Sequence, residues 1–514
     1  MRRFENIFIL VGLLAVWAGC SRQVQTENSE KPNVLFIAVD DLNDWIEPLG
    51  GFSAAVTPNF NRLAAMSTTF TSAHCSAPAC SPSRIAVMTG VHPAKSGILK
   101  NFPGDGPVWR KVPILKNVDT LEQFFQRHGY RTLAGGKIYH TLAPPRTIIN
   151  QADPDGWDFW FPSVHIPVPF QVRAPEEIIY PEGIIGERPS PNFTWGPLPV
   201  GDEKMADYQI VDWAVHELSR EQDRPLFLAV GLTKPHDPWE VPQKYFDQFP
   251  IESIPEVSKL ENDLEDAHDH GRRMIHKFIL QNGEEKRVLQ SYLATMAFTD
   301  AMLGRLLDGL EGSRYRDNTI VVLWSDHGMH MGEKENWEKF TLWERSTHVP
   351  FFIAAPGITK PGTRCDVPVS LQDIYPTLAE LIGAKAPPHC DGVSLLPLLH
   401  GEALDRGPVI TGYQFLEEKA YTVRTADFRY IYYTGSRLEE LYNLIEDPNE
   451  WHNQAYQPEQ AAIVREMRET LKKKVPELRW ENNPPEGYKV KSDGMVRKLG
   501  FTPLENMKYK NEWY

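Results

Sequence analysis

Basic charge is scarce in this chain of 514 residues. Lysine and arginine together number 54 against 68 aspartate and glutamate residues, so the net charge at pH 7 is -14. Because such a surface repels a phosphate backbone, the composition excludes DNA and RNA as expected partners. A polyanionic substrate would also be repelled at long range, so its binding would require local basic groups.

The chain also lacks internal repeats, low-complexity tracts and coiled-coil heptads. Hydrophobic residues make up 41% of the sequence and charged residues 24%, which is typical of a folded, water-soluble protein without long disorder. We therefore expect one large α/β core and one small appendage.

No apolar run near the N-terminus is long enough to span a bilayer. In MRRFENIFILVGLLAVWAGC, two arginines precede an apolar stretch at 7–17 that ends in small residues, as an export signal does. The ending resembles a bacterial lipobox, so we expect a signal peptide at 1–20, lipidation of Cys20 by the lipoprotein-processing machinery, and a flexible tether at 21–31. The expected location is the bacterial cell envelope, lipid-anchored, facing the periplasm or the cell surface; an uncleaved signal anchor is the alternative.

Buried strand patterns alternate with helical patterns after the tether. NVLFIAV at 33–39 is a continuous apolar run, and PLFLAVG, TIVVLWS and FFIAAPG follow at 225–231, 319–325 and 351–357, with a long helical pattern at 288–310. This alternation predicts a doubly wound α/β sheet. From about residue 405 the pattern predicts a small antiparallel sheet with a closing helix. We expect a catalytic domain at 32–405, this subdomain at 406–485 and a tail at 486–514.

Acidic and imidazole side chains follow two of the predicted strands. Asp40 and Asp41 come directly after NVLFIAV, and Asp326 and His327 come after TIVVLWS. Because ligands in open parallel sheets lie beyond the carboxyl ends of the strands, these residues are expected to converge there. Three carboxylates at one place favour a hard divalent cation, although an acidic pair alone more often begins a loop or caps a helix.

The stretch CSPSRIAVMTG, which begins at Cys80, matches C-x-P-S-R-x-x-x-x-T-G at every defined position. On this motif the chain resembles the formylglycine-dependent sulfatases. Further stretches have family counterparts in the same order: VDDLNDW, TPNFNRLAA, GGKIYH, LTKPHDPW and ELYNLIEDPNEWHN. The segments GKIYH, TKPH and SDHG most resemble the iduronate-2-sulfatase-like branch.

The resemblance implies an alkaline-phosphatase-like fold, a mixed sheet with a small C-terminal antiparallel subdomain. It implies that a formylglycine-generating or sulfatase-maturating enzyme converts Cys80 into Cα-formylglycine (3-oxoalanine) and that Arg84 holds this residue in place. It also implies a metal beside residue 80, usually Ca²⁺ rather than Mg²⁺. The implied metal-site residues are Asp40, Asp41, Cys80, Asp326 and His327.

The resemblance further assigns sulfate binding and proton transfer to Lys137, His140, His236 and Lys339. Sulfate ester cleavage needs a strong nucleophile, cations around the sulfate oxygens and an acid for the bridging oxygen. In the family the hydrated aldehyde supplies the nucleophile. His236, together with Lys339, is expected to protonate the departing sugar oxygen. These side chains are the local basic groups that an anionic substrate requires in so acidic a protein.

The sequence thus predicts a sulfuric ester hydrolase that acts on a sulfated oligo- or polysaccharide. The expected substrate is a uronic acid 2-sulfate in a glycosaminoglycan or an algal polysaccharide such as ulvan. Two alternatives remain at this stage, a formylglycine-dependent phosphodiesterase or phosphonate monoester hydrolase and a non-catalytic surface glycan-binding lipoprotein. Of the remaining cysteines, Cys365 and Cys390 could form a disulfide, and Cys75 is expected to be a buried thiol.

Overall fold

The run NVLFIAV forms the central strand β1 (Asn33–Val39), and all its residues are buried. β1 pairs in parallel with β7 (Leu226–Leu232) on one side and with β9 (Thr319–Ser325) on the other. Because strands flank both edges and helices cover both faces, the strand is apolar throughout instead of alternating.

The computed structural model describes residues 31–101, 108–140, 153–161, 194–270, 273–481, 483–492 and 494–507. The expected signal peptide, Cys20 and all but the last residue of the expected tether lie outside these residues. Pro32–Tyr514 forms one compact unit, and the expected boundaries at 405 and 485 stay predictions. Within the described residues, no helix combines the length and apolar character that crossing a membrane requires.

The main sheet has eight strands in the order β13-β2-β12-β9-β1-β7-β4-β5. The strands from β9 to β5 run parallel, whereas β12 is antiparallel to both β9 and β2, so the sheet is mixed. The remaining strands are β2 (Thr68–Phe70), β4 (Arg131–Gly136), β5 (Phe159–Phe161), β12 (Phe351–Ala354) and β13 (Thr363–Cys365).

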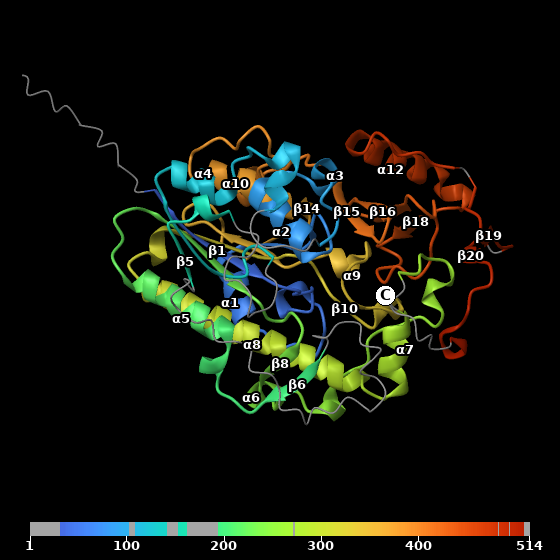
Figure 1. Ribbon diagram of the computed structural model, residues 1–514, viewed down its shortest axis with the longest axis horizontal. Coiled ribbons are helices and arrows are strands. Elements are labelled where there is room, and N and C mark those ends of the chain that lie inside the picture. The colour runs from blue at the N-terminus through green and yellow to red at the C-terminus, as the bar shows by residue number, and fades with distance from the viewer. Residues whose placement is uncertain are drawn as a thin grey trace, which may run out of the picture. The chain divides into compact units, whose positions relative to one another are not determined.

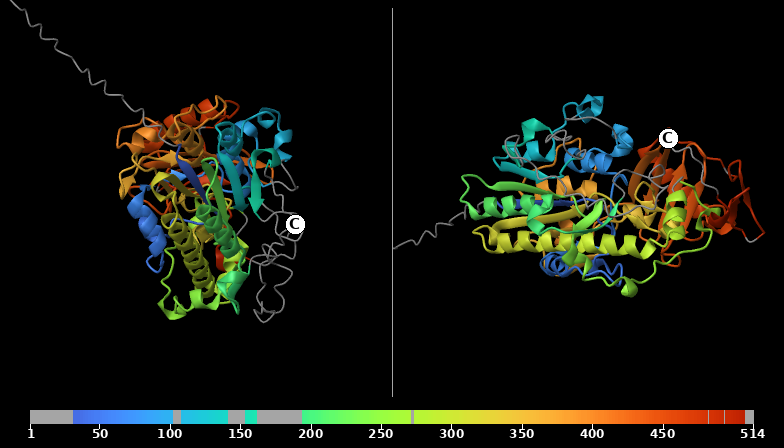
Figure 2. Two further views of the ribbon diagram at one scale, coloured as in Figure 1. Left: turned by 90° about the vertical axis from the view of Figure 1, so that its left-hand side faces the viewer. Right: turned by 60° about the horizontal axis from the view of Figure 1, so that its bottom comes forward.

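Two helical layers cover the two faces of this sheet (Figure 1). Alternate residues of β1 pack into two separate cores, one with α1, α5 and α8 and the other with α2, α4 and α10. Figure 2 shows the yellow α8 running beside the green α5. These helices are α1 (Pro58–Met66), α2 (Cys80–Thr89), α4 (Leu121–Arg127), α5 (Ala206–Ser219), α8 (Glu285–Glu311) and α10 (Ile374–Leu381).

The C-terminal part forms a four-stranded antiparallel sheet, as expected from its sequence. The strands are β15 (Val409–Phe415), β16 (Glu418–Arg424), β17 (Phe428–Tyr433) and β18 (Glu439–Asn443). Helix α12 (Ala461–Lys474) packs Val464, Met467 and Leu471 against this sheet. The α/β architecture with a small antiparallel subdomain is therefore confirmed.

Short elements complete the described part of the chain. They are β3 (Ala73–His74), α3 (Pro93–Ser96), β6 (Trp195–Leu198), β8 (Trp239–Pro242), α6 (Gln243–Phe246), α7 (Arg273–Gln281), β10 (His330–Met331), β11 (Trp337–Glu338), α9 (Glu344–Thr347), β14 (Val369–Ser370), α11 (Leu396–Leu399), β19 (Tyr488–Val490) and β20 (Val496–Lys498).

The four cysteines in the described residues are free thiols. Cys75 is fully buried, and burial raises the pKa of its thiol, which stays protonated. Cys365 and Cys390 are partly exposed and are not joined, so the disulfide that the sequence left open is absent from this structure.

Candidate active site

Two acidic or imidazole pairs meet at the carboxyl ends of β1 and β9. Val39 and Ser325, the last residues of these parallel strands, lie opposite each other in register. Asp40 and Asp41 follow the first strand, and Asp326 and His327 follow the second, and all four are fully buried. The Asp41 N–H donates to Asp326 Oδ1 at 3.2 Å, which joins the two pairs directly.

Asp41 turns sharply away from the strand. Its φ of 59° lies in the left-handed region, which aspartate tolerates better than most residues do. The hydroxyl of Tyr292 on α8 holds this turn by donating to the Asp41 carbonyl at 2.9 Å. The turn is thus fixed by a buried side chain from the neighbouring helical layer.

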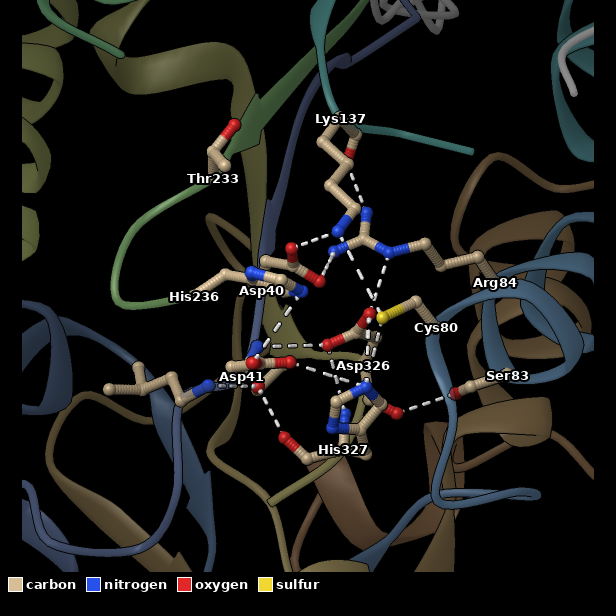
Figure 3. A network of polar contacts seen from close by, with 12 residues as sticks. Asp40, Asp41, Cys80, Ser83, Arg84, Lys137, Thr233, His236, Asp326 and His327 are labelled. Carbon is tan, nitrogen blue, oxygen red and sulfur yellow. Dashed lines mark hydrogen bonds and ion pairs between the residues drawn. The ribbon is translucent and has the colours of Figure 1, made fainter. Parts of the chain in front are cut away.

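Cys80 enters the same site from α2, of which it is the first residue (Figure 3). Its Sγ lies 3.3 Å from His327 Nε2 and 3.9 Å from Lys137 Nζ. Ser83, one turn along the helix, donates its hydroxyl to the Asp326 carbonyl at 2.6 Å. The helix start is therefore attached to the loop that follows β9.

The site contains a set of donor atoms that fits a divalent cation. One potential ligand atom from each of Asp40, Asp41, Cys80 and His327 lies within 4.8 Å of the others. Asp41 Oδ1 is buried and has no hydrogen-bond partner in the described part of the chain, which is costly for a carboxylate without a cation. Asp326 is not in this set, although its Oδ2 lies 3.7 Å from His327 Nε2.

Arg84 braces the carboxylates from the other side. Its Nε lies 2.7 Å from Asp326 Oδ2 and its Nη2 lies 3.1 Å from Asp40 Oδ1, all fully buried. Burial opposes the guanidinium charge, but Asp326 and Asp40 outweigh it and raise the pKa of Arg84. From the sequence, Arg84 was expected to hold residue 80 in place. In the structure, its described hydrogen bonds go to the two aspartates and to the carbonyls of Lys137 and Ile138, in the loop that follows β4.

Two buried lysines face the two aspartates after β1. Lys137 Nζ pairs with Asp40 Oδ2, and Lys339 Nζ lies 2.6 Å from Asp41 Oδ2. Burial lowers the pKa of each amine, but the facing aspartate outweighs it, so the pKa of Lys137 is raised and that of Lys339 lies well above its usual value. Both amines are therefore cationic.

His140 and His236, the two histidines expected to bind sulfate or transfer protons, differ in their contacts. His236 Nε2 lies 3.8 Å from Asp41 Oδ2, and burial together with the Lys339 charge holds the His236 pKa well below its usual value. His140 Nδ1 is buried without a hydrogen-bond partner among the described residues. Burial and the charge of Lys137 lower the His140 pKa to about 3. The structure thus joins His236 to the cluster by contact and places His140 beside it without one.

Sequence reasoning did not single out Asp237. Its Oδ1 lies 3.0 Å from His236 Nδ1 and 3.9 Å from Lys339 Nζ, and burial raises its pKa to about 7. The signal was an acidic residue directly after a candidate histidine in the loop that follows β7. His236, Asp237 and Asp41 could offer a second group of metal ligands, but the Lys339 amine already lies against both carboxyl groups.

Family comparisons match most of the chain. The family described as Sulfatase matches residues 32–384, and the one described as N-sulphoglucosamine sulphohydrolase, C-terminal, matches residues 332–477. The first match alone covers more than half of the sequence and contains the whole acidic cluster.

Curated relatives lead to the same family. A protein named Sulfatase from Formosa agariphila is 39% identical over 465 residues, which cover 87% of this chain and 88% of that protein. Choline-sulfatase from Rhizobium meliloti is 30% identical, with 83% of each chain covered. Iduronate 2-sulfatase from Homo sapiens is 26% identical, with 82% of this chain and 90% of that protein covered.

Solved structures share the fold. A phosphonate monoester hydrolase from Silicibacter pomeroyi superposes with a TM-score of 0.70 at 20% identity, covering 91% of this chain and 99% of that chain. A 2-O GAG sulfatase superposes with a TM-score of 0.65 at 22% identity, covering 88% and 96%. These likenesses confirm the expected sulfatase and alkaline-phosphatase-like architecture. With a matching family over residues 32–384 and a buried acidic cluster beside Cys80, the chain belongs to the sulfatase family and is an enzyme that hydrolyses sulfate esters.

Proposed function

We propose that this sulfatase acts on a sulfated carbohydrate and that it belongs to the iduronate-2-sulfatase-like branch of the family. A uronic acid 2-sulfate of a glycosaminoglycan is the preferred substrate, and an algal polysaccharide such as ulvan is the second candidate. The observation that carries the proposal is the convergence of Arg84, Lys137 and Lys339 beside Cys80 in a chain of net charge -14. At contact distance, these basic side chains together with the metal ion proposed below attract a sulfate more strongly than the diffuse negative surface repels it.

The relatives support the carbohydrate without deciding the sugar. Iduronate 2-sulfatase matches most of this chain, and its name states a uronate 2-sulfate. Choline-sulfatase matches at higher identity, and its name states a small cationic alcohol. Each of the three basic side chains of the site is paired with an aspartate, so the choice between these two substrates rests on the sulfate-release experiment below.

We propose that Cys80 is matured to formylglycine by a formylglycine-generating or sulfatase-maturating enzyme. The position fits this residue, because the Cys80 side chain lies at the start of α2 and faces both His327 and Lys137. When hydrated, the aldehyde supplies an oxygen nucleophile for sulfur. Arg84 then acts indirectly, by fixing Asp40 and Asp326 on the far side of the nucleophile.

We propose Ca²⁺ as the metal, with Mg²⁺ less favoured. Asp40, Asp41 and His327 would hold it next to residue 80, with Asp326 beside His327, and the buried Asp41 Oδ1, which accepts no hydrogen bond from the described residues, is an oxygen that a cation would satisfy. Bound there, the ion supplies positive charge that stabilises negative charge on oxygen. Carboxylate oxygens are the ligands that Ca²⁺ prefers.

The remaining side chains of the site bind the sulfate group or protonate the leaving oxygen. Lys137 and Lys339 hold the sulfate oxygens as point charges. His236 lies on the side of Lys339 and, together with that amine, delivers a proton to the departing sugar oxygen. His140 borders the pocket and contacts the sulfate or the sugar.

We also propose that the mature protein begins at a lipidated Cys20 in the bacterial cell envelope. The support is the lipobox-like ending of residues 1–20 and the polar stretch at 21–31. Mass analysis of protein from membranes tests this proposal, because an unmodified chain that begins elsewhere would contradict it.

Sulfate release decides the substrate. Matured protein and a Cys80→Ala variant are incubated with sulfated glycan oligosaccharides, choline sulfate and phosphodiesters, and the released anions are measured by ion chromatography. Release from 2-sulfated uronates by the matured protein alone supports the proposal. Release from choline sulfate only, or of phosphate only, would overturn it in favour of a small-alcohol sulfatase or the phosphoester alternative.

A further inference from the structure

The loop after β7 positions an acidic side chain between the two groups proposed to protonate the leaving oxygen. Asp237 is 5% exposed and its Oδ1 lies 3.0 Å from His236 Nδ1. The same oxygen lies 3.9 Å from Lys339 Nζ. One carboxylate therefore contacts the ring of one candidate acid and the amine of the other.

The contact fixes which side of the His236 ring faces the pocket. His236 Nδ1 lies 2.6 Å from the Asp237 carbonyl and 3.0 Å from its carboxylate, so Nδ1–H donates to Asp237. Nε2 points the other way and lies 3.8 Å from Asp41 Oδ2 (Figure 3). The Asp237 side chain thus adds a second acceptor to a backbone acceptor that every variant retains.

The loop itself is rigidly held, so the position of Asp237 is defined. Lys234 is 2% exposed. Its amine donates to the His236 carbonyl at 3.2 Å and to the Pro238 carbonyl. Buried Asp207 on α5 accepts the N–H groups of Thr233 and Lys234 at 2.8–3.0 Å. These contacts anchor both sides of the turn that presents His236 and Asp237.

We propose that Asp237 is a positioning residue for the leaving-group side of the reaction. It orients His236 Nε2 and holds the Lys339 amine toward the bridging oxygen. As residue 80 forms its bond to sulfur, the bond between sulfur and the bridging oxygen breaks and its electron pair stays on that oxygen. The oxygen takes its proton from the cationic Lys339 amine, directly or relayed by His236 Nε2. This inference rests on the proton-transfer roles given above and does not depend on which sugar is the substrate.

A series of aryl sulfates tests the role without requiring the natural substrate. Their phenol leaving groups range from acidic, as in 4-nitrophenol, to weakly acidic, as in 4-methoxyphenol. We expect Asp237→Ala to lower kcat on the least acidic leaving group by about 10²-fold, because general acid catalysis contributes roughly this much or more. On 4-nitrophenyl sulfate, which needs little protonation, the loss is expected to stay below about 5-fold. The plot of log kcat against leaving-group pKa therefore becomes steeper.

Two further variants distinguish a loss of positioning by Asp237 from an effect on folding. Asp237→Asn keeps an acceptor for His236 and should give an intermediate slope, and it decides the question if Asp237→Ala has a lowered Tm or formylglycine content. Asp300→Asn alters another buried aspartate, which accepts the Asn59 and Phe60 N–H groups at 2.9 Å, and should leave the slope unchanged. An equal loss on every aryl sulfate, or no loss, would overturn the positioning role.

The outcome is independent of the proposed substrate. A wild-type enzyme that releases no sulfate from any glycan would refute the carbohydrate proposal. The steeper slope of Asp237→Ala would still establish the role of Asp237. Conversely, glycan hydrolysis with an unchanged slope would retain the proposed function and refute the positioning role.

Discussion

Cys80 and His327 meet at 3.3 Å, Sγ to Nε2, although they are 247 positions apart in the sequence. Cys80 is the first residue of α2 and His327 follows β9. The contact therefore joins a helix of one layer to the carboxyl end of a central strand. The reactive residue of the family motif is therefore placed directly against a predicted metal-site residue. The chemistry proposed for the site depends on this junction.

Replacing Cys80 by serine should reduce sulfate release to background. A serine that remains an alcohol would form a simple sulfate ester, which has no exit of the kind the aldehyde provides. Sulfate release by purified protein, with residue 80 identified by mass spectrometry, measures this. Cys75→Ser is the matched control, because Cys75 is also buried but does not belong to the acidic cluster. Full activity of Cys80→Ser would contradict the assigned nucleophile.

Removing divalent cations should abolish activity and lower the Tm. The buried Asp41 Oδ1 accepts no hydrogen bond from the described residues and lies 3.4 Å from His327 Nε2. A cation bound there should stabilise the folded state by about 2.7 kcal/mol at a concentration 100 times its Kd. Thermal unfolding in a chelator, then with Ca²⁺ or Mg²⁺ added back, measures the effect. Asp41→Asn should lose most of the Ca²⁺-dependent shift. A Tm that is insensitive to both ions would exclude a resident divalent cation.

Truncating Lys339 or Lys137 to alanine should lower kcat/KM by about 10²-fold each, since each removes a charged donor from the sulfate site. The buried partner carboxylates, Asp41 and Asp40, also lose their counter-charge. Steady-state kinetics at constant ionic strength measures the loss. Exposed Lys116→Ala provides a control for the change in net charge. Losses no larger than that of the control would remove both lysines from the sulfate site.

Stability should fall as pH rises from about 4.5 to about 7 because of Glu122 on α4. Burial raises the pKa of this carboxyl from 4.5 to about 7, so the folded state retains a proton that the unfolded chain releases. Glu122→Gln should remove the contribution of this carboxyl to the slope and raise the free energy of unfolding at pH 8 by about 3 kcal/mol. The Tyr139 hydroxyl, 2.8 Å from Oε1, keeps its acceptor in the variant. Urea unfolding at pH 5 and pH 8 measures the change, and an unaltered pH dependence would contradict it.

The acidic pairs could be located from sequence because strand ends are readable and parallel pairing is regular. NVLFIAV and TIVVLWS predicted β1 and β9 within their observed bounds, and residues that follow such strands share one edge of the sheet. The same reasoning predicted both helical layers and the antiparallel C-terminal sheet. Each of these inferences depends on local periodicity and on simple rules of topology.

The side-chain partners could not be predicted in the same way. Arg84 reaches Asp40 and Asp326 because α2 crosses the ends of two strands, and helix orientation leaves no trace in the spacing of residues. Asp237 depends on a loop whose path is fixed by distant Asp207. The lack of a bond between Cys365 and Cys390 likewise follows from chain path and not from composition.

The complete burial of α2 determines the order of events in the production of the active enzyme. Cys80 is 1% exposed, and Ser81, Pro82, Ser83 and Arg84 are buried with it. A modifying enzyme that must bind this stretch has no access to it once the sheet and its helices have folded. The proposed conversion of Cys80 would therefore have to occur on the nascent or still unfolded chain, in the interval between synthesis and folding.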